Sequence, residues 1–265
     1  MSSFLSFYHR VAVIFGLPFF LIVTKGFLFP LPLLDFWWHL KMGSLIVAGG
    51  SIPRTDLFSY TSTGSLFIAQ NWLAEVFYYG IFKLGGLPLL IILNAVLLTA
   101  TLIFVLLLCR ESTTRFRIAS ISALITCLAL ACNARPQVFS LFFFAFFYWI
   151  LDGYRFKRRD ALWILPPAMA LWANTHGAFA VGLGLIAIYL GSESYRRWCN
   201  PTHPEVLSTR RLWKLAFVFA ACIVATFINP ETYRIYQYLQ TVLADQASQR
   251  LVMEWQPPRD QLKTA

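Results

Sequence analysis

The chain has 265 residues, of which 58% are hydrophobic and 13% are charged, and its mean hydropathy is +0.62. A soluble domain of this size cannot bury so much apolar surface in one core, so the composition excludes an ordinary soluble protein. The net charge of +10 comes from short basic clusters between apolar runs. Such clusters are typical of loops at an anionic membrane surface and argue against nucleic acid as a partner.

The apolar runs predict an all-α fold: a polytopic transmembrane helical bundle of about seven spans in a single membrane domain, residues 1–265. The predicted spans are residues 11–32, 87–108, 118–134, 137–152, 161–174, 178–192 and 213–229. No signal-peptide cleavage site follows the first run, so we interpret it as a retained span. Pro166-Pro167 should kink the fifth span, which is short and could instead form a re-entrant hairpin with the sixth.

The basic residues predict the orientation of the chain in the membrane. Every predicted inner loop carries at least three Lys or Arg residues, whereas the short outer connections carry only Arg135. Because basic residues favour the cytoplasmic side, we expect a multi-pass protein of the inner (plasma) membrane with its N-terminus in the cytoplasm. The tail, residues 230–265, is then outside.

The first outer loop, residues 33–86, is long enough to be structured. Residues 34–48 and 72–84 predict two amphipathic helices that lie in the membrane interface, where tryptophan is favoured. We expect Asn71 to cap the second of these helices and Gly85-Gly86 to end it.

Unusual polar residues gather on the predicted outer side of the membrane. Ionisable groups near a membrane are costly and often functional, so their convergence on one face predicts a single outward-facing site. The residues are Asp35, His39, Asp56, Arg135, Asn174, His176, Asn229 and Glu254.

Asp35 and His39 are four residues apart and share one face of the predicted helix 34–48. A carboxylate there could act as a general base, although aspartate is also a good helix N-cap. Arg135 could bind phosphate in a bidentate way, or its side chain could extend to the lipid headgroups.

His176 follows Asn174 in a Trp-Ala-Asn-Thr-His-Gly run and could donate to a phosphate or bind a metal. Asp56 and Glu254 could orient a substrate or a divalent cation. Asp56 could equally satisfy its own turn. The histidines show no zinc-ligand spacing, so a metal stays an open alternative. No phosphate-binding loop, serine-hydrolase motif or dinucleotide-binding motif is present in the sequence.

Several segments resemble bacterial membrane proteins related to the GT-C glycosyltransferases. The matching segments are residues 35–43 (DFWWHLKMG), 50–61 (GSIPRTDLFSYT), 71–75 (NWLAE), Arg135-Pro136, 172–177 (WANTHG), Asn229-Pro230 and Glu254-Trp255. The resemblance, which extends to the protein O-mannosyltransferase-like group, covers most of the chain. It implies a module of about seven spans with a large first outer loop, which uses polyprenyl-phosphate-linked sugars on the outer face of the membrane.

By this resemblance Asp35 is the base that activates the acceptor. We expect His39 and Asp56 to belong to the same catalytic group, and Arg135, Asn174, His176 and Glu254 to bind substrate and phosphate. The chain lacks the paired acidic residues of several GT-C branches and ends soon after the seventh predicted span. It would therefore be a truncated or minimal version of that module, and such a version could be inactive.

Two other functions remain open from the sequence. The first is a non-catalytic membrane protein of the same fold, either a partner subunit or a lipid-phosphate-binding protein. The second is a secondary transporter, which we rank last because it would need ionisable residues near the bilayer centre and inverted repeats. Only Lys25 lies well inside a predicted span, and no repeat is visible.

Overall fold

The computed structural model describes residues 16–29, 35–109, 113–132 and 134–252. The regular elements of these residues are all helices, and the described chain forms no β-strand, only an isolated bridge between Thr55 and Leu66, which confirms the all-α prediction for this part of the chain. The elements are α2 (Leu17–Leu28), α3 (Phe36–Gly49), α4 (Trp72–Cys109), α5 (Thr113–Leu130), α6 (Gln137–Phe156), η2 (Leu162–Ile164), α7 (Leu165–Thr175), α8 (Phe179–Cys199), α9 (Thr209–Thr226), α10 (Arg234–Ala244) and α11 (Gln246–Leu251).

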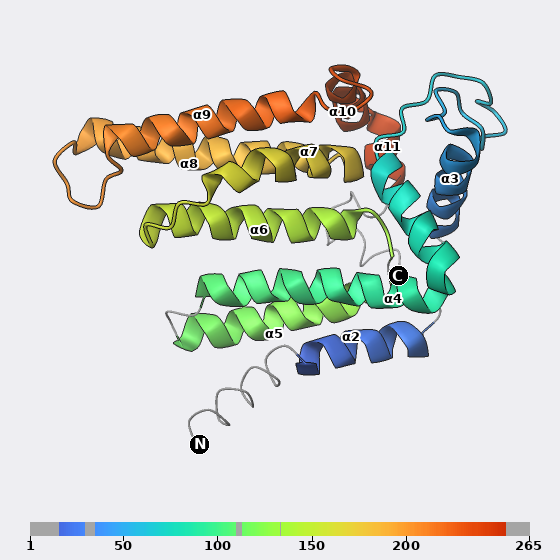
Figure 1. The fold of residues 1–265 in the computed structure, drawn as a ribbon, viewed down its shortest axis with the longest axis horizontal. Coiled ribbons are helices and arrows are strands. Elements are labelled where there is room, and N and C mark those ends of the chain that lie inside the picture. Colours follow the sequence, from blue (N-terminus) through green and yellow to red (C-terminus); the bar gives the residue numbers. More distant parts are fainter. Residues whose placement is uncertain (1–15, 30–34, 110–112, 133, 253–265) are drawn as a thin grey trace.

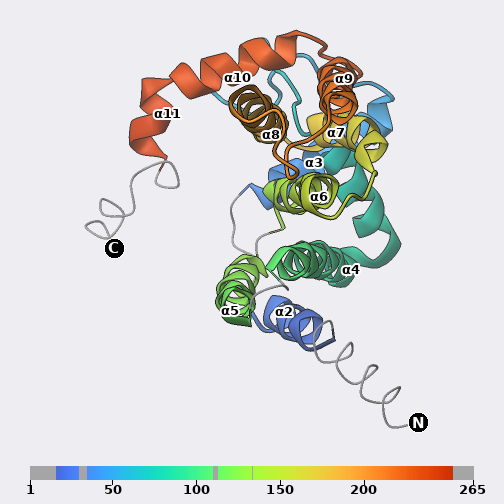
Figure 2. The ribbon, with the colours of Figure 1, turned by 90° about the vertical axis from the view of Figure 1, so that its left-hand side faces the viewer.

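The helices form two groups that meet where α4 packs against α6. Figure 2 shows α2, α4 and α5 in one group and α6, α7, α8 and α9 in the other. A small apolar cluster around Ile22, Leu98 and Cys127 fills the first group. A larger cluster joins α3 and α4 to the second group, with Phe147 and Trp172 fully buried in it.

The long helices run back and forth, so their connections alternate between two ends of the bundle (Figure 1). One end carries α3, the first half of α4, residues 134–136 before α6, and the connections 176–178 and 227–233. The opposite end carries the connections 157–161 and 200–208. This alternation brings segments that are about 100 residues apart in the sequence to the same end of the molecule.

A glycine pair divides α4 into two parts. Gly85 has φ −155° and Gly86 has φ +62°, and neither is helical. A positive φ suits glycine, which has no Cβ, so the prediction that helix 72–84 ends at this pair is confirmed. The predicted cap is wrong, because the side-chain oxygen of Asn71 is buried and accepts no hydrogen bond from the described residues.

The fifth predicted span differs most from expectation. Pro166 and Pro167 lie in the first turn of α7, so they begin a helix and do not kink one. This position suits proline, because the first helical N–H groups have no partner within the helix. With 11 residues, α7 is about 16 Å long, roughly half the thickness of the hydrocarbon core.

Two helices in the described part of the chain, Trp72–Cys109 and Gln137–Phe156, are long and apolar enough to cross a membrane. Leu17–Leu28 and Ser120–Leu130 are apolar but shorter. A helical bundle is therefore shown, whereas the seven-span arrangement is not confirmed by helix length and composition.

Gly43 sets the distance between α3 and α4. A Cβ added to Gly43 would lie 2.1 Å from the backbone oxygen of Glu75 and 3.0 Å from the Cβ of Tyr79. We expect Gly43→Ala to lower the free energy of unfolding by about 1–3 kcal/mol, because the two helices must move apart. Thermal unfolding of the detergent-solubilised protein, followed by tryptophan fluorescence, measures this loss.

Gly49→Ala is the matched control for this prediction, since both glycines lie in α3. A Cβ on Gly49 meets only the hydroxyl of Ser51, at 4.0 Å. Alanine is favoured over glycine in helices, so this variant should melt at or slightly above the wild-type temperature. Equal melting of the two variants would contradict the packing role of Gly43.

Candidate functional site

An ion pair between Asp35 and Arg135 is the centre of the candidate site. Asp35 precedes α3 and Arg135 lies in the connection before α6, and Nη2 of the arginine donates to Oδ2 of the aspartate. The Asp35 side chain is 44% exposed, whereas that of Arg135 is 12% exposed. The hydroxyl of Tyr78 in α4 donates to the backbone oxygen of Arg135 at 3.1 Å, which fixes this connection against the helix.

The geometry bears on one of the alternatives that the sequence leaves open, the capping role of Asp35. Asp35 occupies the N-cap position of α3, but its side chain makes no capping hydrogen bond. The guanidinium of Arg135 pairs with the carboxylate of Asp35, and the arginine side chain is 12% exposed. A guanidinium can bind a phosphate, and an accessible carboxylate beside it can accept a proton at the same place.

A second polar pair lies one turn further along α3. Nδ1 of His39 is 2.8 Å from Oε1 of Glu75 in α4, and the two residues are only 3% and 1% exposed. The ring centroids of His39 and Trp38 are also 4.0 Å apart. The carboxylate of Glu75 orients the imidazole through Nδ1, as an acidic partner does in many catalytic histidine pairs.

His176 is held by Ser140 and by the backbone. Trp172 Nε1–H donates to Ser140 Oγ at 2.8 Å, and the serine hydroxyl lies 2.8 Å from Nδ1 of His176. The backbone N–H of Ala178 also points to Nδ1, at 3.3 Å. Because Nδ1 accepts these hydrogen bonds, this network assigns the proton of the neutral imidazole to Nε2, which leaves Nε2–H as a donor.

Burial keeps His176 neutral at physiological pH. Desolvation is the main cause that lowers the pKa of His176 to about 4, and the charges of His39 and Arg135 lower it further. A neutral imidazole with Nε2–H available can donate a hydrogen bond to a phosphate or sugar oxygen.

Asn174 and Asn229 connect the elements around the site. Asn174 accepts a hydrogen bond from Trp72 Nε1 at 2.7 Å and donates to the backbone oxygen of Ala170. Asn229 donates to the backbone oxygen of Ala173 at 2.9 Å and accepts from the N–H of Glu231. Both amide groups are therefore used within the protein, and we assign them to positioning.

Asp56 satisfies its own turn. Its carboxylate accepts hydrogen bonds from the N–H groups of Phe58 and Ser59 and from the Ser59 hydroxyl. These bonds, with that of the hydroxyl as the largest, lower the pKa of the Asp56 carboxyl. Asp56 thus shapes the loop before α4, while Glu254 lies outside the described residues.

Glu75, Ser140 and Tyr78 complete the site but were assigned no role from the sequence. Glu75 has a signal that could have found it, because it is the acidic residue of the otherwise apolar segment 72–79. Ser140 and Tyr78 have no such signal, since serine and tyrosine are ordinary within apolar helices. Their roles depend on which helices are neighbours, and that becomes known only from the fold.

A divalent cation has no evident ligand set in the described part of the chain. No group of three histidine, cysteine or acidic side chains converges there in a way that could hold a metal ion. The acidic side chains of the site are directed to Arg135 and His39. We therefore derive no step through a cation.

Comparisons with known proteins do not extend these observations. No protein-family model matches the sequence, and no curated protein and no solved structure is significantly similar to it.

Proposed function

We propose that this chain is an integral membrane protein that transfers a sugar from a polyprenyl-phosphate donor to an acceptor on the outer face of the membrane. The single observation that carries this proposal is the pairing of Asp35, half exposed, with the largely buried guanidinium of Arg135. The pair places a proton acceptor and a phosphate-binding group side by side. Their segments also carry the motifs that resemble GT-C enzymes.

The outer surfaces of the helices support a membrane location. Large apolar side chains are exposed on several helices, among them Phe20, Ile125, Ile188 and Val224. Lipid rather than water is a suitable solvent for such faces. In the proposed arrangement seven passes are made by α2, the second half of α4, α5, α6, η2 with α7, α8 and α9, and the Asp35–Arg135 end faces outward.

The proposed reaction requires one base and one group that stabilises the leaving phosphate. The acceptor hydroxyl attacks the anomeric carbon of the sugar while the bond from that carbon to the phosphate oxygen breaks. The hydroxyl proton passes to the carboxylate of Asp35, and the polyprenyl phosphate leaves with the bonding electron pair. Arg135 and Nε2–H of His176 stabilise the negative charge that develops on the phosphate.

Arg135 must exchange partners during this reaction. In the structure its guanidinium is bound to Asp35, and a phosphate that takes the guanidinium leaves the carboxylate free. Donor binding would then prepare the base for the acceptor hydroxyl. The same competition makes Asp35 an obstacle to the phosphate, which gives the proposal a distinctive test.

Two buried acceptors at the start of α4 suit a sugar. Oδ1 of Asn71 and Oε2 of Glu75 are buried, and no described residue donates to either. Asn71 immediately precedes α4 and Glu75 lies in its first turn, where the N–H of Glu75 donates to the backbone oxygen of Asn71. Unsatisfied buried acceptors are rare and call for a donor, which the hydroxyl groups of a sugar or a water molecule would provide.

The test of this proposal measures the binding of polyprenyl monophosphate to the detergent-solubilised chain. Arg135→Ala should raise the Kd about tenfold or more, because a charge-assisted hydrogen-bond pair is lost. Arg54→Ala is the matched control: it removes an exposed arginine from the first outer loop and should leave the Kd unchanged. If both variants raised the Kd equally, Arg135 would contribute only general positive charge, and its proposed role in binding the phosphate would be refuted.

A second function, lipid-phosphate binding without chemistry, is favoured by one observation. Asp35 is occupied by Arg135, so the carboxylate becomes a free proton acceptor only after the arginine has moved. In a protein that only binds lipid phosphate, Asp35 would serve to hold Arg135 in place. The Asp35→Asn variant separates the two functions, as argued below.

A further inference from the structure

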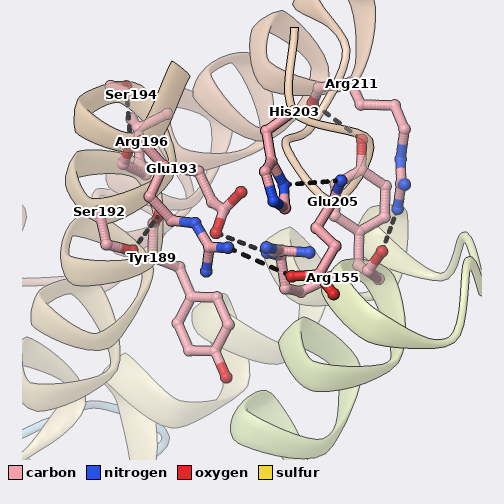
Figure 3. Close-up of polar contacts among 11 residues, drawn as sticks. Arg155, Tyr189, Ser192, Glu193, Ser194, Arg196, His203, Glu205 and Arg211 are labelled. Atoms are coloured by element: carbon pink, nitrogen blue, oxygen red, sulfur yellow. Dashed lines mark hydrogen bonds and ion pairs between the residues drawn. The ribbon is translucent and has the colours of Figure 1, made fainter. Parts of the chain in front are cut away.

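A cavity of about 710 Å³ opens at the end of the bundle opposite the candidate site. Its walls come from the end of α6, the segment that follows it, and the loop between α8 and α9 (Figure 3). The charged residues among its lining are Arg155, Arg158, Asp160, Glu205 and Arg211. Its volume lies within the range of about 300–1,000 Å³ that is usual for ligand sites.

Arg155 provides a buried guanidinium in the wall of this cavity. Its Nε donates to Oε1 of Glu193 at 2.5 Å, and the side chains are 7% and 5% exposed. Nη2 of Arg155 and Oε2 of Glu193 are buried and have no hydrogen-bond partner among the described residues. A buried guanidinium N–H without an acceptor is costly, so this corner of the cavity favours a ligand that brings an oxygen.

The two acidic residues that line the cavity form ion pairs with basic residues outside the lining. Asp160 pairs with Lys214 at 2.5 Å, and Glu205 pairs with Arg196 at 3.6 Å. Arg211 lies over the ring of Tyr154, 4.4 Å from its centroid, and donates to the backbone oxygen of the same residue. Arg155 is likewise paired with Glu193, so the positive charge left over in the cavity is that of Arg158 and Arg211.

Arg158 carries part of this positive charge. It is exposed and has an unusual backbone conformation. It has φ +52°, and the N–H groups of Lys157 and Arg159 on either side both donate to the backbone oxygen of Gly153. This is the left-handed position that ends a helix and usually holds glycine. An arginine here costs backbone energy, and its side chain lines the cavity without a hydrogen bond or ion pair to any described residue.

Aromatic side chains around this end place the cavity at the depth of lipid headgroups. Trp163, Trp198 and Trp213 are 53%, 81% and 72% exposed. They lie in η2, at the end of α8 and at the start of α9, close in sequence to the segments that form the cavity. Exposed tryptophans are typical of the interface between hydrocarbon and water.

We propose that this cavity binds the phosphate group of an anionic ligand, with Arg158 and Arg155 as its guanidinium donors. Guanidinium groups match the geometry of phosphate oxygens and hold them in a bidentate way. The phosphate can belong to the headgroup of an acidic lipid or to a soluble phosphate, and the test distinguishes these sources. The cavity is at the other end of the molecule from Asp35, so this inference is independent of the sugar-transfer proposal.

The test titrates the full chain in nonionic detergent with two probes at constant ionic strength. The probes are dihexanoyl phosphatidylglycerol below its micelle concentration and inorganic phosphate, and dihexanoylglycerol serves as the control that lacks phosphate. Saturable binding of phosphatidylglycerol alone identifies a lipid headgroup, and saturable binding of inorganic phosphate identifies a soluble source. Saturation by neither probe, or equal binding of dihexanoylglycerol, would overturn the proposal.

Arg158→Gly tests the residue assignment, because its effects on stability and binding have opposite directions. Glycine suits the positive φ, so the variant should melt at or above the wild-type temperature without ligand. The loss of a charged donor should raise the Kd of the bound probe about tenfold or more. Arg159→Ala removes the same charge one residue away, outside the lining, and should bind like wild type. Equal weakening by both variants would overturn the assignment.

Discussion

Asp35→Asn is expected to reduce sugar transfer about 10²–10⁴-fold while polyprenyl monophosphate binds at least as tightly as it does to wild type. The loss is the usual contribution of a general base, which asparagine cannot replace. The unchanged or tighter binding follows from the ion pair, since Asp35 competes with phosphate for Arg135. Turnover of a polyprenyl-phosphate sugar and equilibrium binding of polyprenyl monophosphate are measured on the same preparation.

Two outcomes would separate the competing functions of Asp35. Full turnover in Asp35→Asn would eliminate the carboxylate as the base. Weaker phosphate binding would mean that Asp35 holds Arg135 in place, as in a protein that only binds lipid phosphate. Asp152→Asn is the control, because Asp152 is an acidic residue at the far end of α6 that pairs with Lys157 at 3.1 Å. This variant should keep both properties of wild type.

Glu75→Ala is expected to lower the free energy of unfolding by about 3 kcal/mol, because it leaves the buried Nδ1 of His39 without its partner. Glu75→Gln keeps an oxygen in place for the imidazole and should lose clearly less stability. Thermal unfolding of both variants, with His39→Ala and the double variant, gives the coupling energy between the two side chains.

Glu205→Ala is the control for this prediction. Its side chain is 72% exposed, and its ion pair with Arg196 at the opposite end should contribute little. A melting temperature of Glu75→Ala equal to that of Glu205→Ala would show that the His39–Glu75 pair does not hold α3 against α4. In that case the rigid placement of Asp35 would need another explanation.

The sequence predicts much of the helical arrangement, because long apolar runs separated by polar connections indicate helices directly. The segments 87–108 and 137–152 correspond to the second half of α4 and to most of α6. The alternation of these helices also accounts for the position of Asp35, Arg135 and His176 at one end. Helix boundaries were harder to predict where proline is involved, since Pro166-Pro167 suits the start of a helix as well as a kink.

The partners within the site could not be predicted, because they depend on packing between helices. The Asp35–Arg135 pair joins residues 100 positions apart, and the pair of His39 with Glu75 crosses from α3 to α4. Composition and periodicity contain no information on which side chain meets which across such an interface. For this reason the sequence left two roles open for Asp35, a general base and a helix cap, and the structure shows that its side chain makes no capping hydrogen bond.

The most direct test of the central claim is native mass spectrometry of the wild-type chain extracted gently from its own membrane. The account predicts a bound lipid with the mass of a polyprenyl phosphate that carries one sugar, and this mass would name the donor. Arg135→Ala, extracted in the same way, should lose most of the bound lipid. Bulk phospholipid alone on the wild-type protein, under conditions that preserve other lipid complexes, would contradict the assignment of the Asp35–Arg135 end as a donor site.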